Sequence, residues 1–166
     1  MPLKAGGATR VINCQVGDDL AGQLHRRICD SIRDDLEANA LYVTDERQAL
    51  LIVSCDLVFI ERPFMQAIAA DIAAATGVPA ECVLIACTHT HDGPNTFAML
   101  HDSPRNDAYL ERLRGWLAEV AKGAVASARP ARVGWAKGHA HIGYNRRLCW
   151  ADGTHSMYGD ATRGDF

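Results

Sequence analysis

The chain has 166 residues, of which 48% are hydrophobic and 22% are charged, as in an ordinary globular protein. This length corresponds to a single domain covering residues 1–166. The formal net charge of −3 argues against a nucleic-acid partner, because proteins that bind nucleic acids are usually basic.

No segment of the sequence is typical of export or membrane insertion. Residues 1–7 lack the apolar core of a signal peptide. No apolar stretch approaches the length of about 20 residues that a membrane helix needs. We therefore expect a cytoplasmic protein without a transmembrane segment, and these features do not define its oligomeric state.

The first third of the chain predicts β-structure on both sides of a polar segment. Residues 8–12 are β-prone, and residues 17–37 are polar and charged, which indicates a surface loop with a helical turn near residues 20–28. Two apolar runs, residues 40–43 and 49–55, are joined by a short polar turn and predict a hairpin. The second run is apolar on both faces, as is typical of a central strand.

A helix and a further strand follow this hairpin. Glu61-Arg62-Pro63 begins the helix, because proline suits the first helical turn, and Gly77 ends it. The next apolar run, residues 82–86, predicts a buried strand, so that strand, helix and strand form a βαβ unit. We therefore predict an α/β fold in which a mixed β-sheet combines an N-terminal hairpin with a βαβ unit and is flanked by helices.

The second half of the chain predicts a long loop, a helix and one more strand. Residues 88–106 are rich in turn-forming residues, and a loop of this length inside a domain is usually functional. Asn106 or Asp107 can cap an amphipathic helix that Pro130 ends. Residues 131–136 predict a strand, and the tail after it contains few residues suited to a core.

Six cysteines are distributed along the chain without C-x-x-C spacing. Several of them lie in apolar runs, which is typical of buried, reduced thiols. The spacing does not fit a zinc-thiolate site. This cysteine usage agrees with the expected cytoplasmic location.

The candidate site is the segment Thr88-His89-Thr90-His91-Asp92-Gly93-Pro94, which directly follows the predicted strand at residues 82–86. Residues i and i+2 of an extended segment point the same way, so His89 and His91 can face one substrate. Neutral imidazole is the commonest protein metal ligand, and histidine also serves as a general acid or base. Asp92 can orient one of the two imidazoles. The alternative is a pair of polar loop residues without a function.

Three other parts of the chain carry side chains suited to a site. His139 and His141 repeat the H-x-H spacing, so the two histidine pairs together can form a zinc site, or these two can be surface residues. Arg146 and Arg147 can bind a carboxylate or phosphate or polarise a carbonyl oxygen, although surface ion pairs are the ordinary role of such a pair. Asp56, at the end of the hairpin's second strand, can support a site or cap the following helix.

The segment Ala86-Cys87-Thr88-His89-Thr90-His91-Asp92-Gly93-Pro94 resembles the A-T-H-T-H-S-G-P signature of the neutral/alkaline (non-lysosomal) ceramidase family, with Asp92 in place of the serine. Further segments resemble that family in the same order along the chain. They are residues 7–12, 40–56, 78–84, 128–134 and 145–147. The resemblance covers most of the chain but only the N-terminal part of the family's catalytic domain.

The resemblance implies a zinc-dependent hydrolase of N-acyl amides, including lipid-like small molecules, in which a metal-activated water attacks the amide. It implies that His89 binds Zn²⁺ and that His91 takes part in catalysis beside the metal. Arg146, in the Asn145-Arg146 element, corresponds to an arginine that holds the substrate or stabilises the oxyanion. The family's remaining ligands lie downstream of residue 166, which implies that this chain is the N-terminal portion of a longer catalytic domain.

Two other interpretations are open at this point. The chain can be a non-catalytic or truncated ceramidase-like domain that binds a metal or another ligand at His89. It can also be a self-sufficient metal protein that uses His89, His91, His139 and His141. Zinc stoichiometry distinguishes these interpretations, because the chain supplies one recognised ligand of the family.

Overall fold

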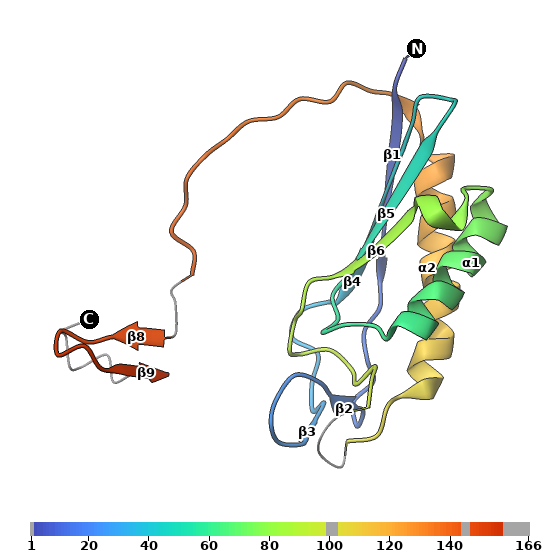
Figure 1. Ribbon diagram of the computed structural model, residues 1–166. Coiled ribbons are helices and arrows are strands. Elements are labelled where there is room, and N and C mark those ends of the chain that lie inside the picture. The colour runs from blue at the N-terminus through green and yellow to red at the C-terminus, as the bar shows by residue number, and fades with distance from the viewer. Residues whose placement is uncertain (1, 99–102, 144–146, 158–166) are drawn as a thin grey trace. The chain divides into compact units, whose positions relative to one another are not determined.

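The computed structural model describes residues 2–98, 103–143 and 147–157. Its internal contacts group the chain into two units, Met1–Arg132 and Val133–Phe166. The first unit contains a five-stranded sheet, two α-helices and the candidate motif, and the second contains a short hairpin (Figure 1). The predicted site residues are therefore divided between the two units.

The main sheet of the first unit is mixed. Its strands are β1 (Lys4–Val11), β4 (Glu37–Thr44), β5 (Ala49–Cys55), β6 (Val83–Cys87) and β7 (Arg129–Pro130). Their order is β6-β5-β4-β1-β7, with β5 and β6 parallel and the other neighbouring pairs antiparallel. β4 and β5 form the predicted hairpin, and β5, the helix α1 (Arg62–Thr76) and β6 form the predicted βαβ unit. The predicted α/β class with a mixed sheet is confirmed.

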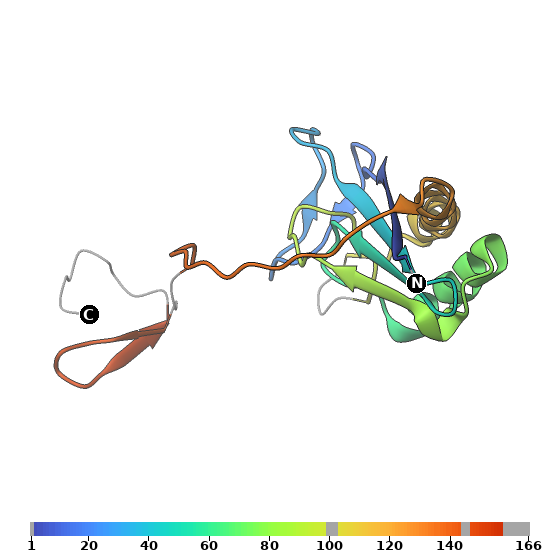
Figure 2. The same cartoon turned by 90° about the horizontal axis from the view of Figure 1, so that it is seen from above.

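The two helices begin and end where the local sequence requires. Pro63 lies in the first turn of α1, and Gly77 terminates that helix with φ 75°, a left-handed conformation that glycine adopts freely. The helix α2 (Asp107–Ala126) is capped by Asn106, whose side chain accepts a hydrogen bond from the N–H of Tyr109. Both helices lie on the same face of the sheet (Figures 1 and 2). Neither helix of the described residues combines the length and the apolar character that a membrane span requires.

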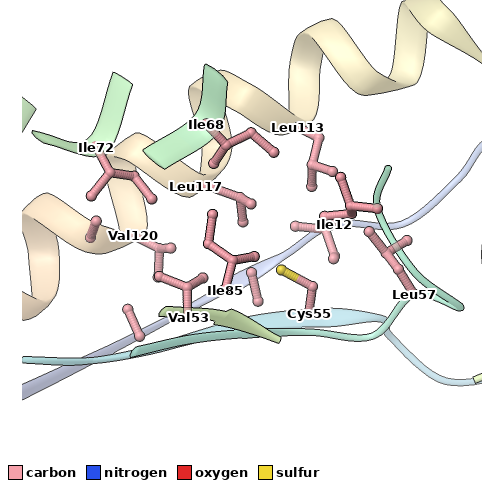
Figure 3. Packing of buried hydrophobic residues seen from close by; sticks show 14 of the residues in the cluster. Ile12, Val53, Cys55, Leu57, Ile68, Ile72, Ile85, Leu113, Leu117 and Val120 are labelled. Atoms are coloured by element: carbon pink, nitrogen blue, oxygen red, sulfur yellow. The ribbon is translucent and has the colours of Figure 1, made fainter. Parts of the chain in front are cut away.

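The core lies between these helices and the sheet (Figure 3). Alternate residues of β5, namely Leu51, Val53 and Cys55, are fully buried on this face, as the two-residue period of a strand requires. They meet a layer of aliphatic side chains from the helices. These are Ile68 and Ile72 of α1 and Leu113, Leu117 and Val120 of α2. On the opposite face Leu41 and Leu84 are partly exposed, so the helices cover only one side of the sheet.

Residues 20–28 do not form the predicted helical turn. Instead β2 (Asp19–Leu20) pairs with β3 (Arg27–Ile28) in a short antiparallel ladder. Gly22, between them, has φ 96°, which is incompatible with a right-handed helix. The N–H of Ala21 donates to the carbonyl oxygen of Gly93 (N···O 2.9 Å) rather than to a helical neighbour. A long-range backbone contact thus replaces the local turn.

The strand predicted at residues 131–136 is also wrong. β7 lies just before this range and pairs with the first two residues of β1. Lys4, the first residue of β1, is the partner of Pro130, so β1 has no residue left to pair with residues 131–136. Residues 131–143 contain no strand. Pro130 belongs to β7 and does not end α2, which already ends at Ala126.

The second unit contains a hairpin in its described part. β8 (Arg147–Cys149) pairs with β9 (His155–Met157). Trp150, in the connecting turn, is buried, and its indole N–H donates to the hydroxyl of Ser156 (N···O 2.9 Å). Residues 133–143, which include His139 and His141, contain neither helix nor strand.

The cysteines are free thiols, but not all of them are buried as predicted, because Cys82 and Cys87 are only half-buried. Cys14, Cys29 and Cys55 are buried, whereas Cys149 is exposed. Burial raises the pKa of the Cys14 thiol and that of the Cys55 thiol to about 12, because a low-dielectric environment disfavours the thiolate.

We expect Cys55 to make the protein sensitive to alkaline pH. The pKa of its thiol is about 12 in the folded state, above the ordinary value of 9.0 that applies to the unfolded chain. Between these values the unfolded chain releases a proton that the folded state retains, so the free energy of unfolding falls by about 1.4 kcal/mol per pH unit for such a thiol. Cys55→Ala should remove this part of the slope. Chemical denaturation on both sides of the unfolded thiol's pKa measures it, and an unchanged slope would contradict the expectation.

Candidate functional site

The candidate site lies at the edge of the sheet where the parallel strands β5 and β6 both end. Their last residues, Cys55 and Cys87, are partners in the sheet, so Asp56 and Thr88 follow them side by side. β1 ends and β4 begins at the same edge. The β2–β3 segment (residues 19–28) lies at this edge as well (Figure 1). Several segments that are distant in sequence therefore meet at the motif.

Asp56 joins the strand ends through its carboxylate and its backbone. Oδ1 accepts a hydrogen bond from the hydroxyl of Thr88 (O···O 3.1 Å), and Oδ2 accepts one from the N–H of Glu37 (N···O 3.0 Å). The N–H of Asp56 donates to the carbonyl oxygen of Glu37 (N···O 2.9 Å). The residue at the N-cap of α1 is Glu61, so Asp56 supports the loop that carries Thr88 and does not cap the helix.

We expect Asp56→Ala to lower the free energy of unfolding by about 2 kcal/mol, because the half-buried N–H of Glu37 and the hydroxyl of Thr88 lose their acceptors. Asp56→Asn keeps one acceptor oxygen and should lose less. Urea denaturation of the two variants measures both losses. Stability of Asp56→Ala equal to that of the unmodified chain would show that these hydrogen bonds do not hold the loop.

His89 is held by the loop that follows β5. Its φ of 64° lies in the left-handed region, which non-glycine residues adopt rarely and often at functional sites. Its N–H donates to the carbonyl oxygen of Leu57 (N···O 3.0 Å), and its Nδ1 lies 3.0 Å from the carbonyl oxygen of Val58. A carbonyl oxygen can only accept, so Nδ1 carries a proton, and in the neutral imidazole the lone pair is then on Nε2. His89 is an exposed residue, so Nε2, the ring nitrogen that Val58 does not contact, is the candidate ligand atom.

His91 packs against His89. The two imidazole rings meet edge to face, with centroids 5.0 Å apart and planes at 72°. The extended backbone predicted for the H-x-H segment is not present, because φ of His89 is positive. The two rings meet through the left-handed conformation of His89 instead. His91 is half-buried, whereas His89 is exposed. The two histidines are therefore neighbours with different accessibility.

The second half of the motif is held by the β2–β3 segment. The N–H of Ala21 donates to the carbonyl oxygen of Gly93 (N···O 2.9 Å), and the N–H of Asn95 donates to that of Asp19 (N···O 2.8 Å). Gly93 and Asn95 are both buried. These contacts fix the path of the chain after the histidine pair.

Arg27 contacts the motif from β3. Its Nη1 donates to Oδ1 of Asp92 (N···O 3.0 Å), and its Nη2 donates to the carbonyl oxygen of His91. Asp92, which is predicted to orient an imidazole, thus pairs with an arginine. A hollow of about 630 Å³ lies beside this contact, and its lining includes Arg27, Cys29, Thr90 and Asp92. A ligand bound in this hollow would lie next to the motif.

The other predicted site residues lie outside the first unit. His139 and His141 belong to the second unit. Asn145 and Arg146 lie outside the described residues. Within each unit, the described residues contain no group of three or more His, Cys, Asp or Glu side chains that could hold a metal ion. The roles of these four residues stay predictions.

Two contributors to the site, Gly22 and Arg27, are absent from the sequence-based prediction. Both lie in the polar segment 17–37, and both reach the motif through the pairing of the β2–β3 segment with residues 93–95. The one local signal is Gly22 itself, because glycine adopts positive φ freely. The contact between His89 and the carbonyl oxygen of Val58 could not be predicted, because every residue has a carbonyl group and the sequence does not show which one lies beside the imidazole.

The solved structures that share this fold include ceramidases. A crystal structure of neutral ceramidase from Pseudomonas aeruginosa is similar over 78% of this chain, with a TM-score of 0.67 and 20% sequence identity. A structure described as ceramidase complexed with C2 is similar over 78% of this chain, with a TM-score of 0.68 and 23% identity. The chain covers 22% of the length of each of these proteins. The predicted resemblance to neutral ceramidase is confirmed for the fold.

The sequence itself matches no protein-family model. It also matches no curated protein. The likeness to the ceramidase structures therefore establishes the fold, and the roles of individual residues are argued from the geometry of this chain.

Proposed function

We propose that this chain is part of a zinc-dependent amide hydrolase, to which it contributes one zinc ligand and one proton-transfer group. The observation that carries the proposal is the orientation of His89, an exposed residue whose Nδ1 contacts the Val58 carbonyl oxygen, which leaves Nε2 as the nitrogen for a metal. The motif resembles that of neutral ceramidases, and the chain has the fold of ceramidase structures. The proposed substrate is a small-molecule N-acyl amide, including lipid-like ones.

The residues of the site fit a zinc ligand. Histidines that bind metals usually donate their second ring N–H to a carbonyl or carboxylate oxygen, as Nδ1 of His89 does to Val58. A catalytic zinc ion takes about three protein ligands. The described residues of the first unit contain no group of three, so we propose that the other ligands come from outside them.

Zinc, when bound, lowers the pKa of a coordinated water and polarises the amide carbonyl. We assign to His91 the transfer of the water proton to the leaving nitrogen, because its ring lies beside that of His89. Arg146, with Asn145 beside it, is proposed to hold the substrate or the oxyanion. Asp56 keeps the motif in place through Thr88.

A second candidate function is that of a domain that binds a metal or another ligand without catalysis. It is favoured by the lack, among the described residues of each unit, of a group of three metal-binding side chains. A self-sufficient metal site would instead require His139 and His141 to join His89 and His91.

Zinc analysis and amide hydrolysis, measured on the 166-residue chain and on any longer polypeptide that contains it, test these proposals. Stoichiometric zinc and hydrolysis on the longer polypeptide, both lost in His89→Ala, support the hydrolase. Zinc without hydrolysis supports a binding domain. Tight zinc on the 166-residue chain that is lost in His139→Ala or His141→Ala supports the four-histidine site. Zinc on neither form would contradict every metal-based proposal.

A further inference from the structure

The imidazole ring of His91 lies directly on Gly22. A Cβ atom placed on Gly22 would lie 2.4 Å from Cγ, 2.7 Å from Cβ and 2.8 Å from Cδ2 of His91. Side chains in a packed interior do not approach one another so closely. Gly22 also has φ 96°, a conformation that residues with a Cβ atom adopt rarely. Glycine therefore provides both the backbone conformation and the space for the ring.

The same β2–β3 segment binds the backbone around His91. Nη2 of Arg27 donates to the carbonyl oxygen of His91, and Nη1 donates to the carboxylate of Asp92 (N···O 3.0 Å). The N–H of Ala21 donates to the carbonyl oxygen of Gly93 (N···O 2.9 Å). Three consecutive residues of the motif are thus held by one short segment.

His89 has a separate support. Its N–H and its Nδ1 are bound by the carbonyl oxygens of Leu57 and Val58, which follow β5. The β2–β3 segment and the loop after β5 therefore each fix one of the two rings. The position of one ring relative to the other depends on both supports.

We propose that Gly22 and Arg27 are positioning residues that set the place of the His91 imidazole beside His89. The catalytic meaning of this placement rests on the proposed function, in which His91 transfers a proton, but the placement itself does not. A proton-transfer group must lie within hydrogen-bond reach of the reacting atom. Displacing the ring should therefore impair turnover more than substrate binding.

Gly22→Ala, compared with Gly17→Ala, tests the contribution of Gly22. Gly17 has φ 99°, and a Cβ atom on it would meet nothing within 4 Å, so this control imposes the same backbone strain without touching His91. The readouts are side-chain NMR of labelled histidines and the rate at which diethyl pyrocarbonate modifies His91, both at one fixed pH. In Gly22→Ala we expect the ring signals of His91 to shift and its modification to become several-fold faster. In Gly17→Ala both should stay as in the unmodified chain.

Arg27→Gln, compared with Arg33→Gln, tests the contribution of Arg27. The side chain of Arg33 is 94% exposed and pairs with its neighbour Asp34, so both variants remove one charge from the same region. We expect the ring signals of His91 to shift only in Arg27→Gln. If Gly22→Ala does not fold, Arg27→Gln and Arg33→Gln alone decide whether the β2–β3 segment positions the His91 ring.

Kinetics provide a second readout on any zinc-loaded form that hydrolyses an N-acyl amide. Gly22→Ala should lower kcat about 10- to 100-fold, since a small misplacement of a reacting group has effects of this size. KM and zinc content should stay close to their original values, and Gly17→Ala should change none of the three. A loss confined to KM would contradict the catalytic meaning proposed for this placement.

Unchanged ring signals and reactivity of His91 in both Gly22→Ala and Arg27→Gln would overturn the proposal, whether or not the protein binds zinc. Shifted signals together with a lack of zinc and hydrolysis in every form would support the positioning and refute the proposed function. Failure of the positioning proposal and failure of the proposed function therefore give different results.

Discussion

His91→Ala is expected to lower kcat/KM for N-acyl amide hydrolysis about 10²- to 10⁴-fold, the usual contribution of a general acid or base. Zinc content should stay unchanged, because the residue assigned to the metal is His89, whose Nδ1 is bound by Val58. Steady-state kinetics with parallel metal analysis of the zinc-loaded form measure both quantities.

His25→Ala is the control for this variant. His25 is an exposed histidine of the β2–β3 segment, and its removal should leave both kcat/KM and zinc content unchanged. Full turnover by His91→Ala would refute the role assigned to His91. Loss of zinc from His91→Ala would make His91 a metal ligand and would also contradict the assignment.

Gly6→Ala is expected to lower the free energy of unfolding by about 3 kcal/mol, because the added methyl group has no space. Its Cβ would lie 2.1 Å from the carbonyl oxygen of Ala124 and 2.7 Å from the backbone nitrogen of Ala128. These are backbone atoms in α2 and just after it, so the helix has to move away from β1. Denaturant unfolding of the purified variant measures the loss.

Gly7→Ala is the matched control in the same strand. A Cβ atom on Gly7 would come no closer than 3.6 Å to the carbonyl oxygen of Ala40, which is an ordinary contact. We expect its stability to stay near that of the unmodified chain. Equal losses in Gly6→Ala and Gly7→Ala would show that contact with α2 is not the cause.

Those parts of the fold that depend on neighbouring residues could be predicted from the sequence. The hairpin of β4 and β5 follows from two apolar runs on either side of a short polar turn. The limits of α1 follow from Pro63 in its first turn and Gly77 at its end. The position of the candidate site at the end of β6 follows from the apolar run that precedes His89.

The arrangement around the histidines depends on contacts between distant parts of the chain and could not be predicted. Gly22 and Arg27 lie far from His91 in sequence, and the polar segment that contains them shows no periodicity that marks a site. The strand predicted at residues 131–136 is wrong for a related reason. The composition of this segment suits a strand, but Lys4, the first residue of β1, already pairs with Pro130. β1 therefore has no residue left to pair with residues 131–136.

The left-handed backbone of His89 is a further feature that the sequence does not show. Its φ of 64° replaces the extended conformation assumed for the H-x-H motif and changes the reason why the two rings meet. The same residue turns Nδ1 toward the carbonyl oxygen of Val58. This contact, which only the fold creates, selects Nε2 as the nitrogen that can bind a metal ion.

We expect His89 to bind zinc through Nε2 while Nδ1 stays protonated toward the carbonyl oxygen of Val58. Long-range ¹H–¹⁵N NMR of the histidine side chains, recorded with and without Zn²⁺ on the form that binds zinc, tests it directly. We expect the Nε2 signal of His89 to shift on zinc binding, and Nδ1 to carry the proton before and after. His89→Asn, which tolerates positive φ, should fold but lose the zinc. Zinc that binds without moving this signal, or full zinc occupancy in His89→Asn, would contradict the proposed role of His89.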